Sequence, residues 1–381
     1  MRGKRDTQPP MFFAINVEDR IRPDHPLRPL KRMIDEELAA LSPLFDAAYA
    51  ADGRPGVPPE RLLKALLLQA LYSVRSETQL VERVDTDLLF RWFLDMDPAE
   101  PAFDQTAFTR NRPRLERHGV VAAFFDGVVR RAMRAGLCSD DHFSVDGTLI
   151  ESHASIKSFV PKDGTGTGTG GDANGFKSRN AEVDFHGQKR SNATHASRTD
   201  PEARLYKKAD GQPAKLYHAG HAVTENRHGL VVAVAVTEAS GAAEPAAAEA
   251  LVDALRDRLG VRVGTLGGDR GYDSGPHLIA LEGRGVEPHV AMKAGPVGGT
   301  GRRKKADLPL IAARRRMAER ARGDRYRVSQ RCRKRVEEAF GWLKTVAGLY
   351  RTRLVGRWKL AQQVQLAAAA YNLVRMRRLA A

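Results

Sequence analysis

The sequence has very little cysteine. Its 381 residues include only two cysteines, Cys138 and Cys332, which are far apart in the sequence and have no neighbouring cysteine. A disulfide framework requires several cysteines, and a thiolate zinc site requires pairs at short spacing. The sequence therefore predicts neither, and this cysteine usage is typical of a protein of the reducing cytoplasm.

Long apolar runs are lacking as well. The segment Met11–Val17 is too short to span a bilayer, and it lacks the small-residue cleavage pattern of a secretory signal. We therefore expect no membrane role for the chain.

Acidic residues are in deficit. The chain has 62 Lys and Arg against 46 Asp and Glu, a net charge of +16, which favours a polyanionic partner, nucleic acid before an anionic membrane. Fifteen basic residues lie between Arg302 and Arg335, against Asp307, Glu319 and Asp324. A solvated basic surface would explain a spread-out excess, but this concentration favours a phosphate-contacting face.

The N-terminal part has a helical pattern. Leucines recur at helical spacing from Leu62 to Leu71, and Asp104 or Thr106 is suited to cap a further helix that carries Arg110 and Arg114. Helix-turn-helix DNA binding and an ordinary helical bundle with basic exposed faces both fit this pattern.

A different pattern begins near residue 139. Residues 142–151 have strand composition, strand-like segments return at 216–224, 230–237 and 263–267, and a helix is expected at about 245–259. We predict a helical N-terminal DNA-binding or dimerisation domain at 1–138 and a mixed α/β (α+β) sheet domain at 139–381. The Gly- and Thr-rich stretch at about 152–215 is interpreted as an inserted loop outside the sheet.

Two aspartates are candidates for a site at the strand ends. Asp146 follows Val145 within a strand, and Asp269 follows a short apolar strand directly. Each has an ordinary alternative, because Asp146 could be a turn or salt-bridged residue, and Asp269 could cap a helix or pair with Arg270. Asp273 suits the capping role better.

A third acid is expected on a late helix. Helical geometry over residues 333–344 groups Val336, Ala339, Phe340 and Leu343 into a buried stripe. Glu337 lies along one edge of this stripe with Arg333 and Lys344, whereas Glu338 points away. We therefore choose Glu337, although an exposed Arg333–Glu337 ion pair is the simpler alternative.

Three carboxylates of this kind suit hard cations with oxygen ligands. Mg²⁺ is the expected cofactor, with two ions at the site and Mn²⁺ able to replace it. His218 and His221 are an odd number of residues apart on a strand and should face opposite ways, so we assign them no metal role.

The order of these motifs resembles that of bacterial DDE insertion-sequence transposases. Their three blocks are matched by DGT at 146–148, GDRGYDS at 268–274 and R-x3-E-x6-K at 333–344, and residues 53–98 are similar to their helical N-terminal region. One departure is Gln330, where family members often have Tyr, with Tyr326 one helical turn upstream.

The resemblance implies a ribonuclease H-like fold and a transposase that cleaves element ends and joins them to target DNA. It implies Asp146, Asp269 and Glu337 as the catalytic and metal-holding triad, with Arg333 and Lys344 on the DNA backbone. Implied partners are double-stranded DNA with terminal inverted repeats, target DNA and a second copy of the chain, in the cytoplasm at the nucleoid. A noncatalytic DNA-binding protein and a metal-dependent nuclease without strand joining are the competing functions.

Overall fold

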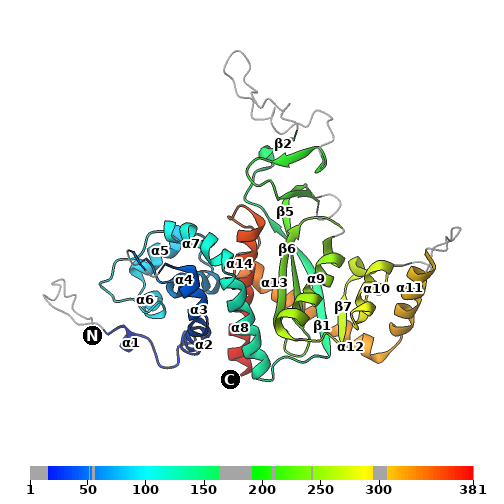
Figure 1. The fold of residues 1–381 in the computed structure, drawn as a ribbon, viewed down its shortest axis with the longest axis horizontal. Helices are drawn as coiled ribbons and strands as arrows, with labels where there is room; N and C mark the ends of the chain where they lie inside the picture. The colour runs from blue at the N-terminus through cyan, green and yellow to red at the C-terminus, as the bar shows by residue number, and fades with distance from the viewer. Residues whose placement is uncertain are drawn as a thin grey trace, which may run out of the picture.

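The computed structural model describes residues 16–50, 52–53, 56–162, 191–207, 212–241, 243–294 and 307–380. The first part is helical (Figure 1). Its helices are α1 (Val17–Arg20), α2 (Leu27–Ala40), α3 (Ser42–Ala48), α4 (Pro59–Leu71), α5 (Glu77–Thr86), α6 (Leu88–Phe93), α7 (Thr106–Arg117) and α8 (Val120–Arg134).

Local sequence explains where these helices begin and what they bury. Pro59 occupies the first turn of α4, where its missing N–H costs nothing, and all leucines of α4 except the partly buried Leu71 are buried. The Ser76 side chain caps α5 by accepting the Gln79 N–H. Asp104 accepts the Thr106 N–H at the start of α7, at a distance of 2.7 Å.

A mixed sheet forms the second part. Its strands are β1 (His142–Glu151), β4 (Arg204–Tyr206), β5 (Lys215–Glu225), β6 (Val231–Glu238), β7 (Thr265–Gly268) and β8 (Glu287–Val290). β5 is antiparallel to β1, β4 and β6, whereas β7 and then β8 continue the sheet parallel to β1. The expected helical region followed by a mixed sheet is confirmed.

Helices cover both faces of this sheet. They are α9 (Ala243–Leu259), α10 (Gly275–Gly283), α11 (Leu308–Arg320), α12 (Asp324–Cys332), α13 (Lys334–Thr345) and α14 (Arg357–Leu379), with short 3-10 turns η1 (Ile156–Ser158) and η2 (Arg270–Tyr272). The neighbours Asp146 and Gly147 of β1 face opposite sides, and they meet Arg333 beside α13 and Glu244 of α9 respectively. α9 and α13 therefore lie on opposite faces.

The C-terminal helix joins the two parts. α14 runs between the N-terminal helices and the sheet and packs against α8, α4 and β6 (Figure 1). Its Asn372 exchanges two hydrogen bonds with the backbone of Val231 on β6. One continuous hydrophobic core extends through both parts, and the division at residue 138 stays a prediction.

The stretch at 152–215 is only partly outside the main sheet. β2 (Phe159–Pro161) and β3 (His195–Ser197) form a separate two-stranded sheet, as an inserted loop allows. β4, however, pairs with β5 in the main sheet, so the prediction was wrong for residues 204–206. The pairing satisfies backbone groups at the start of β5 that β6 does not reach. The tract at 164–171 lies outside the described residues.

None of the described helices has the length and apolar character needed to cross a membrane.

Candidate active site

The parallel pairing of β1 and β7 brings the two candidate aspartates close to each other. Ser144 is opposite Gly267 in the register of these strands. Asp146 lies two residues further along β1 and shares a face with Ser144, because side chains alternate along a strand. Asp269 lies just past the last residue of β7, at the N-cap of η2, and its charge raises the pKa of Asp146, so the two carboxylates are close enough to interact. The structure thus brings together two residues that are far apart in the sequence.

Asp146 is mostly buried and is influenced by the charges of several neighbouring side chains. Its side chain is 19% exposed. Burial is the main cause that raises the pKa of its carboxyl to about 6, and the charges of Asp269 and Glu244 raise it further. The Gly147 N–H, which donates to Asp146 Oδ1 at 2.8 Å, and the Arg333 guanidinium act in the opposite direction. A buried acid among other acids requires a cation nearby.

Arg333 supplies positive charge between two of the candidate acids. Its Nη1 lies 4.0 Å from Asp146 Oδ2, and its Nη2 lies 3.4 Å from Glu337 Oε1. The buried Arg333 Nε has no hydrogen-bond partner among the described residues. The intrahelical ion pair considered as an alternative therefore exists, and the same guanidinium also faces Asp146.

Helix α13 presents Glu337 and Glu338 in different directions. Its buried residues are those of the predicted stripe, Val336, Ala339, Phe340 and Leu343. The exposed fractions of the two glutamate side chains are similar, 55% for Glu337 and 63% for Glu338. Their partners differ, because Glu337 pairs with Arg333 whereas Glu338 lies 3.8 Å from Arg375 of α14. Glu337 is therefore linked to Asp146 through their shared partner Arg333, whereas Glu338 is not.

Glu244 is an acid of the site that the sequence analysis did not select. It lies at the start of α9, and its carboxylate lies over Gly147 and Gly271. A Cβ on Gly147 would be 2.8 Å from Glu244 Oε1, and one on Gly271 would be 2.7 Å from Glu244 Oε2 and 2.9 Å from Asp269 Oδ1. Burial raises the pKa of Glu244, and the charge of Asp269 adds to this.

The only sequence sign of Glu244 is a glycine close after each aspartate, Gly147 directly after Asp146 and Gly271 two residues after Asp269. These glycines leave room for a fourth carboxylate, but an acid at a helix start usually has a dipole or capping role. The two glycines indicate a nearby carboxylate only once the position of α9 over the sheet is known. Sequence spacing alone could not have identified Glu244.

The donor set fits a hard divalent cation. Asp146 lies in the middle of β1 and Asp269 just past the end of β7, and the Glu244 carboxylate approaches them from the α9 side of the sheet. Arg333 supplies neutralising positive charge on the α13 side. Within the described ranges, no three Asp, Glu, His or Cys side chains are already close enough to hold one ion. Glu337 is turned onto Arg333, so its carboxylate would have to rotate to join the aspartates.

Asp269 and Asp273 have distinct local roles. Asp269 Oδ1 accepts the Gly271 N–H at 2.7 Å and so caps η2. Asp273 was the preferred helix cap, but this is wrong. Its carboxylate accepts the Lys293 N–H and pairs with Arg314 of α11, because a buried carboxylate is better satisfied by a guanidinium and an N–H together.

The predicted DNA-contacting residues lie in two places. Lys344 is on α13, seven residues beyond Glu337, which is about 10 Å at 1.5 Å per residue. Arg110 and Arg114 are exposed on α7, on the other side of α14 from the acids (Figure 1). Arg114 stacks over the Tyr49 ring at 4.5 Å. The structure brings Arg333 to the acids but not Arg110 or Arg114.

Many charges of the basic stretch have internal partners. Arg316 and Arg320 of α11 both pair with Glu282 of α10, and Arg325 of α12 lies 3.4 Å from Glu287 of β8. These ion pairs attach α11 to α10 and α12 to the edge strand β8. Part of the local charge excess therefore has a structural use, and residues 302–306 lie outside the described ranges.

Gln330 and Tyr326 attach α12 to the strand ends. The Gln330 side-chain amide donates to the carbonyl oxygens of His289 and Gly268. The Tyr326 hydroxyl donates to the Val290 carbonyl oxygen at 3.4 Å, and its ring contacts His289 edge-on. Tyr326 is therefore directed at β8.

His218 and His221 share no site. His218 Nε2 lies 2.8 Å from Asp200 Oδ2, and His221 Nε2 lies 2.7 Å from Thr237 Oγ1. Their separate partners agree with the predicted opposite orientation on β5.

Comparison with known families identifies both parts of the chain. The family described as Transposase domain (DUF772) matches residues 15–114, and the family described as Transposase DDE domain matches residues 138–373. No curated protein and no solved structure matches the chain. The DDE domain is a ribonuclease H-like fold of metal-dependent enzymes, which agrees with the sheet order found here. Since the second match takes in more than half of the chain, the protein belongs to the DDE transposases of insertion sequences.

Proposed function

We propose that this transposase cleaves the ends of its insertion element and joins them to target DNA, with Asp146, Asp269 and Glu337 as its catalytic acids. The observation that carries the proposal is the proximity of Asp146 and Asp269, which follows from the pairing of β1 with β7 and from the effect of the Asp269 charge on Asp146, with Arg333 between Asp146 and Glu337. Acids gathered around the middle of β1, the end of β7 and the first turn of α13 are suited to a phosphate centre.

The acids would hold divalent metal, and we include Glu244 as a fourth member of the set. Two Mg²⁺ ions, or Mn²⁺ in their place, would supply the charge that activates water or a DNA 3′ hydroxyl and stabilises the departing oxygen. Asp146, with a pKa of about 6, is mostly ionised at neutral pH and can therefore bind metal there. The Arg333 guanidinium is within reach of a phosphate that approaches Asp146 or Glu337.

The DNA substrate would be held by basic residues on both parts of the chain. Arg333 and Lys344 would contact the backbone near the cleaved bond, and Arg110 and Arg114 of α7 would contact it further away. The proposed substrates are terminal inverted repeats and target DNA. An element has two ends, so we propose that two copies of the chain act together on DNA, at the nucleoid.

A strand-transfer assay tests this function. A labelled, pre-cleaved element end is incubated with the full chain and a target plasmid in Mg²⁺, in Mn²⁺ and in EDTA. Metal-dependent joining of label to plasmid supports the proposal, and Asp269→Asn should abolish it while DNA binding persists. Metal-dependent hydrolysis without joining would instead identify a nuclease, and binding without either reaction would overturn the proposed chemistry.

A further inference from the structure

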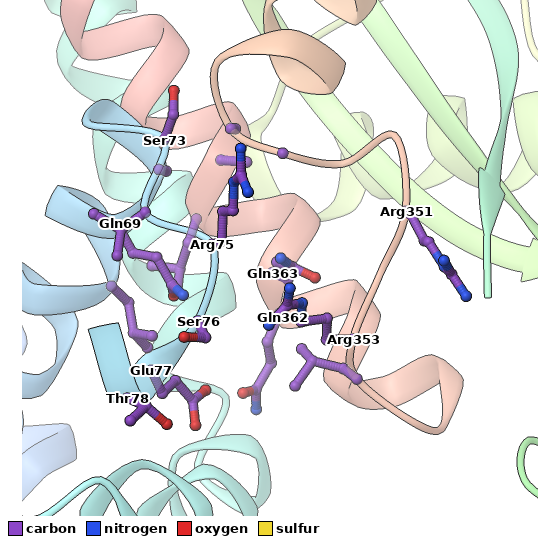
Figure 2. Close-up of a pocket in the computed structure, with 18 of the residues that line it drawn as sticks. Gln69, Ser73, Arg75, Ser76, Glu77, Thr78, Arg351, Arg353, Gln362 and Gln363 are labelled. Atoms are coloured by element: carbon purple, nitrogen blue, oxygen red, sulfur yellow. The ribbon is translucent and has the colours of Figure 1, made fainter. Parts of the chain in front are cut away.

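A groove of about 850 Å³ lies between the N-terminal helices and the segment that follows α13. One wall comes from the end of α4, the turn before α5 and the start of α7. The other comes from residues 345–354 and from α14. Figure 2 shows Arg75 and Ser76 on the first side, Arg353 on the opposite loop and Gln362 and Gln363 of α14 between them.

The charged lining of the groove is mainly positive. It consists of four arginines and a single glutamate: Arg75, Arg112, Arg351, Arg353 and Glu77. Arg112 and Glu77 pair with each other. Figure 2 shows Arg351 at the outer side of the loop. Its Nε lies 3.7 Å from Glu151 Oε1.

Arg75 and Arg353 remain available to a ligand. Both are exposed, and neither has an ion pair or a hydrogen-bond partner among the described side chains. Gln69, Thr109 and Gln363 add neutral hydrogen-bonding groups to the lining, and Tyr350, 63% exposed, adds an aromatic ring at the rim. Arginine, neutral polar groups and an exposed ring are the combination that nucleic-acid backbones and bases contact.

The groove is connected to the acidic site along α13. Glu337, Gly341 and Thr345 are four residues apart and are all exposed, so they form one stripe, and Thr345 lines the groove. A side chain added at Gly341 would meet open space. Glu337 and Thr345 are about 12 Å apart at 1.5 Å per helical residue.

β1 gives a second estimate of the distance between the acids and the groove. Glu151, at the end of β1, forms a bridge with Arg351 of the groove loop. Asp146 and Glu151 are about 17 Å apart at 3.3 Å per strand residue. Two independent elements thus place the groove at a similar distance from the acids.

The near side of the groove, at Thr345 and at the Glu151–Arg351 bridge, is thus about four to five nucleotides from the acids at 3.4 Å per nucleotide. From this geometry we propose that the groove binds the DNA backbone beginning at that distance from the cleaved bond, with Arg75 and Arg353 contacting its phosphates. The inference rests on the proposed function, because it assumes that the cleaved phosphate lies at the acids. The bound DNA would then contact the N-terminal helices and the catalytic part at once, which makes α14 the support of a shared binding surface.

The test measures binding of an element-end duplex to the full chain in EDTA, over a range of salt concentrations. The double variant Arg75→Ala/Arg353→Ala should bind at least about tenfold more weakly. Its plot of log affinity against log salt should lose about two in slope, because each lost phosphate contact removes about 0.9. Arg32→Ala, an exposed arginine on α2, is the matched control and should change neither value. Arg75→Lys/Arg353→Lys should retain most of the slope, which separates a charge effect from a folding defect.

Single methylphosphonate substitutions in the duplex test which phosphates the groove contacts. A neutral linkage four or five nucleotides from the cleaved bond, or just beyond, should weaken binding to the wild-type chain and have little further effect on the double alanine variant. An unchanged salt slope in that variant, an equal loss in Arg32→Ala, or sensitivity confined to other linkages would overturn the inference. Displacement of the duplex by millimolar inorganic phosphate, with no effect of any linkage, would indicate a small-anion site and overturn it too. Because binding is measured without metal, failure here leaves the strand-transfer result unaffected, and failure of strand transfer leaves this binding result intact.

Discussion

The negative charge of Asp146 should lower the folding stability of the protein when no metal is bound. The same charge should be required for catalysis. Folding raises the pKa of its carboxyl from 3.8 to about 6, which corresponds to about 3 kcal/mol. A carboxyl with a raised pKa holds its proton more tightly in the folded than in the unfolded chain. The contribution of this protonated carboxyl to folding stability is therefore complete below pH 3.8, and it is lost as the pH rises to about 6.

The replacement Asp146→Asn removes the charge and keeps the shape of the side chain. Its Oδ1 can still accept the Gly147 N–H. We expect this variant to be more stable than the wild type in EDTA, by about 3 kcal/mol at pH 8 and about 1 kcal/mol at pH 4.5. The same variant should have no cleavage or joining activity.

Urea unfolding at both pH values, with and without Mg²⁺, measures these differences. Mg²⁺ should stabilise the wild type at pH 8 and leave the stability of the variant unchanged. The difference in free energy of unfolding between the two proteins should therefore become smaller. An Asp146→Asn chain that is less stable than the wild type at pH 8, or a stability difference that does not depend on pH, would refute the electrostatic reasoning.

Three further predictions concern the same site. Glu337→Gln should abolish cleavage while DNA binding persists, and Glu338→Gln, whose glutamate faces Arg375, should retain cleavage; equal loss at both positions would contradict the choice of Glu337. Glu244→Gln should weaken Mn²⁺ binding, measured by titration calorimetry, by about tenfold. Gly147→Ala should do the same by displacing the Glu244 carboxylate, and unchanged Mn²⁺ affinity in both variants would exclude Glu244 from the set. Cleavage in Mg²⁺ should fall as the pH drops below about 6, where Asp146 takes up a proton, with a midpoint that moves to lower pH as Mg²⁺ increases; a midpoint independent of Mg²⁺ would argue against metal binding by this carboxyl.

The sequence predicted the features that depend on local periodicity. The buried stripe of α13 follows from spacing at 3.6 residues per turn, and it placed Glu337 on the correct helix beside Arg333. The strand around Asp146 and the helical N-terminal part were predictable for the same reason, since apolar spacing is a property of a short segment.

Tertiary structure decided the features that depend on pairing between distant segments. The parallel pairing of β1 with β7 brings Asp146 close enough to Asp269 for their charges to interact, and no local pattern contains that pairing. The position of α9 brings Glu244 over two glycines, and the packing of α11 and α12 assigns arginines of the basic stretch to internal acids. Local sequence fixes which face of an element is buried, because backbone geometry repeats within each element. Which faces meet depends on how the whole core packs, and that packing determined which acids from distant segments lie near one another.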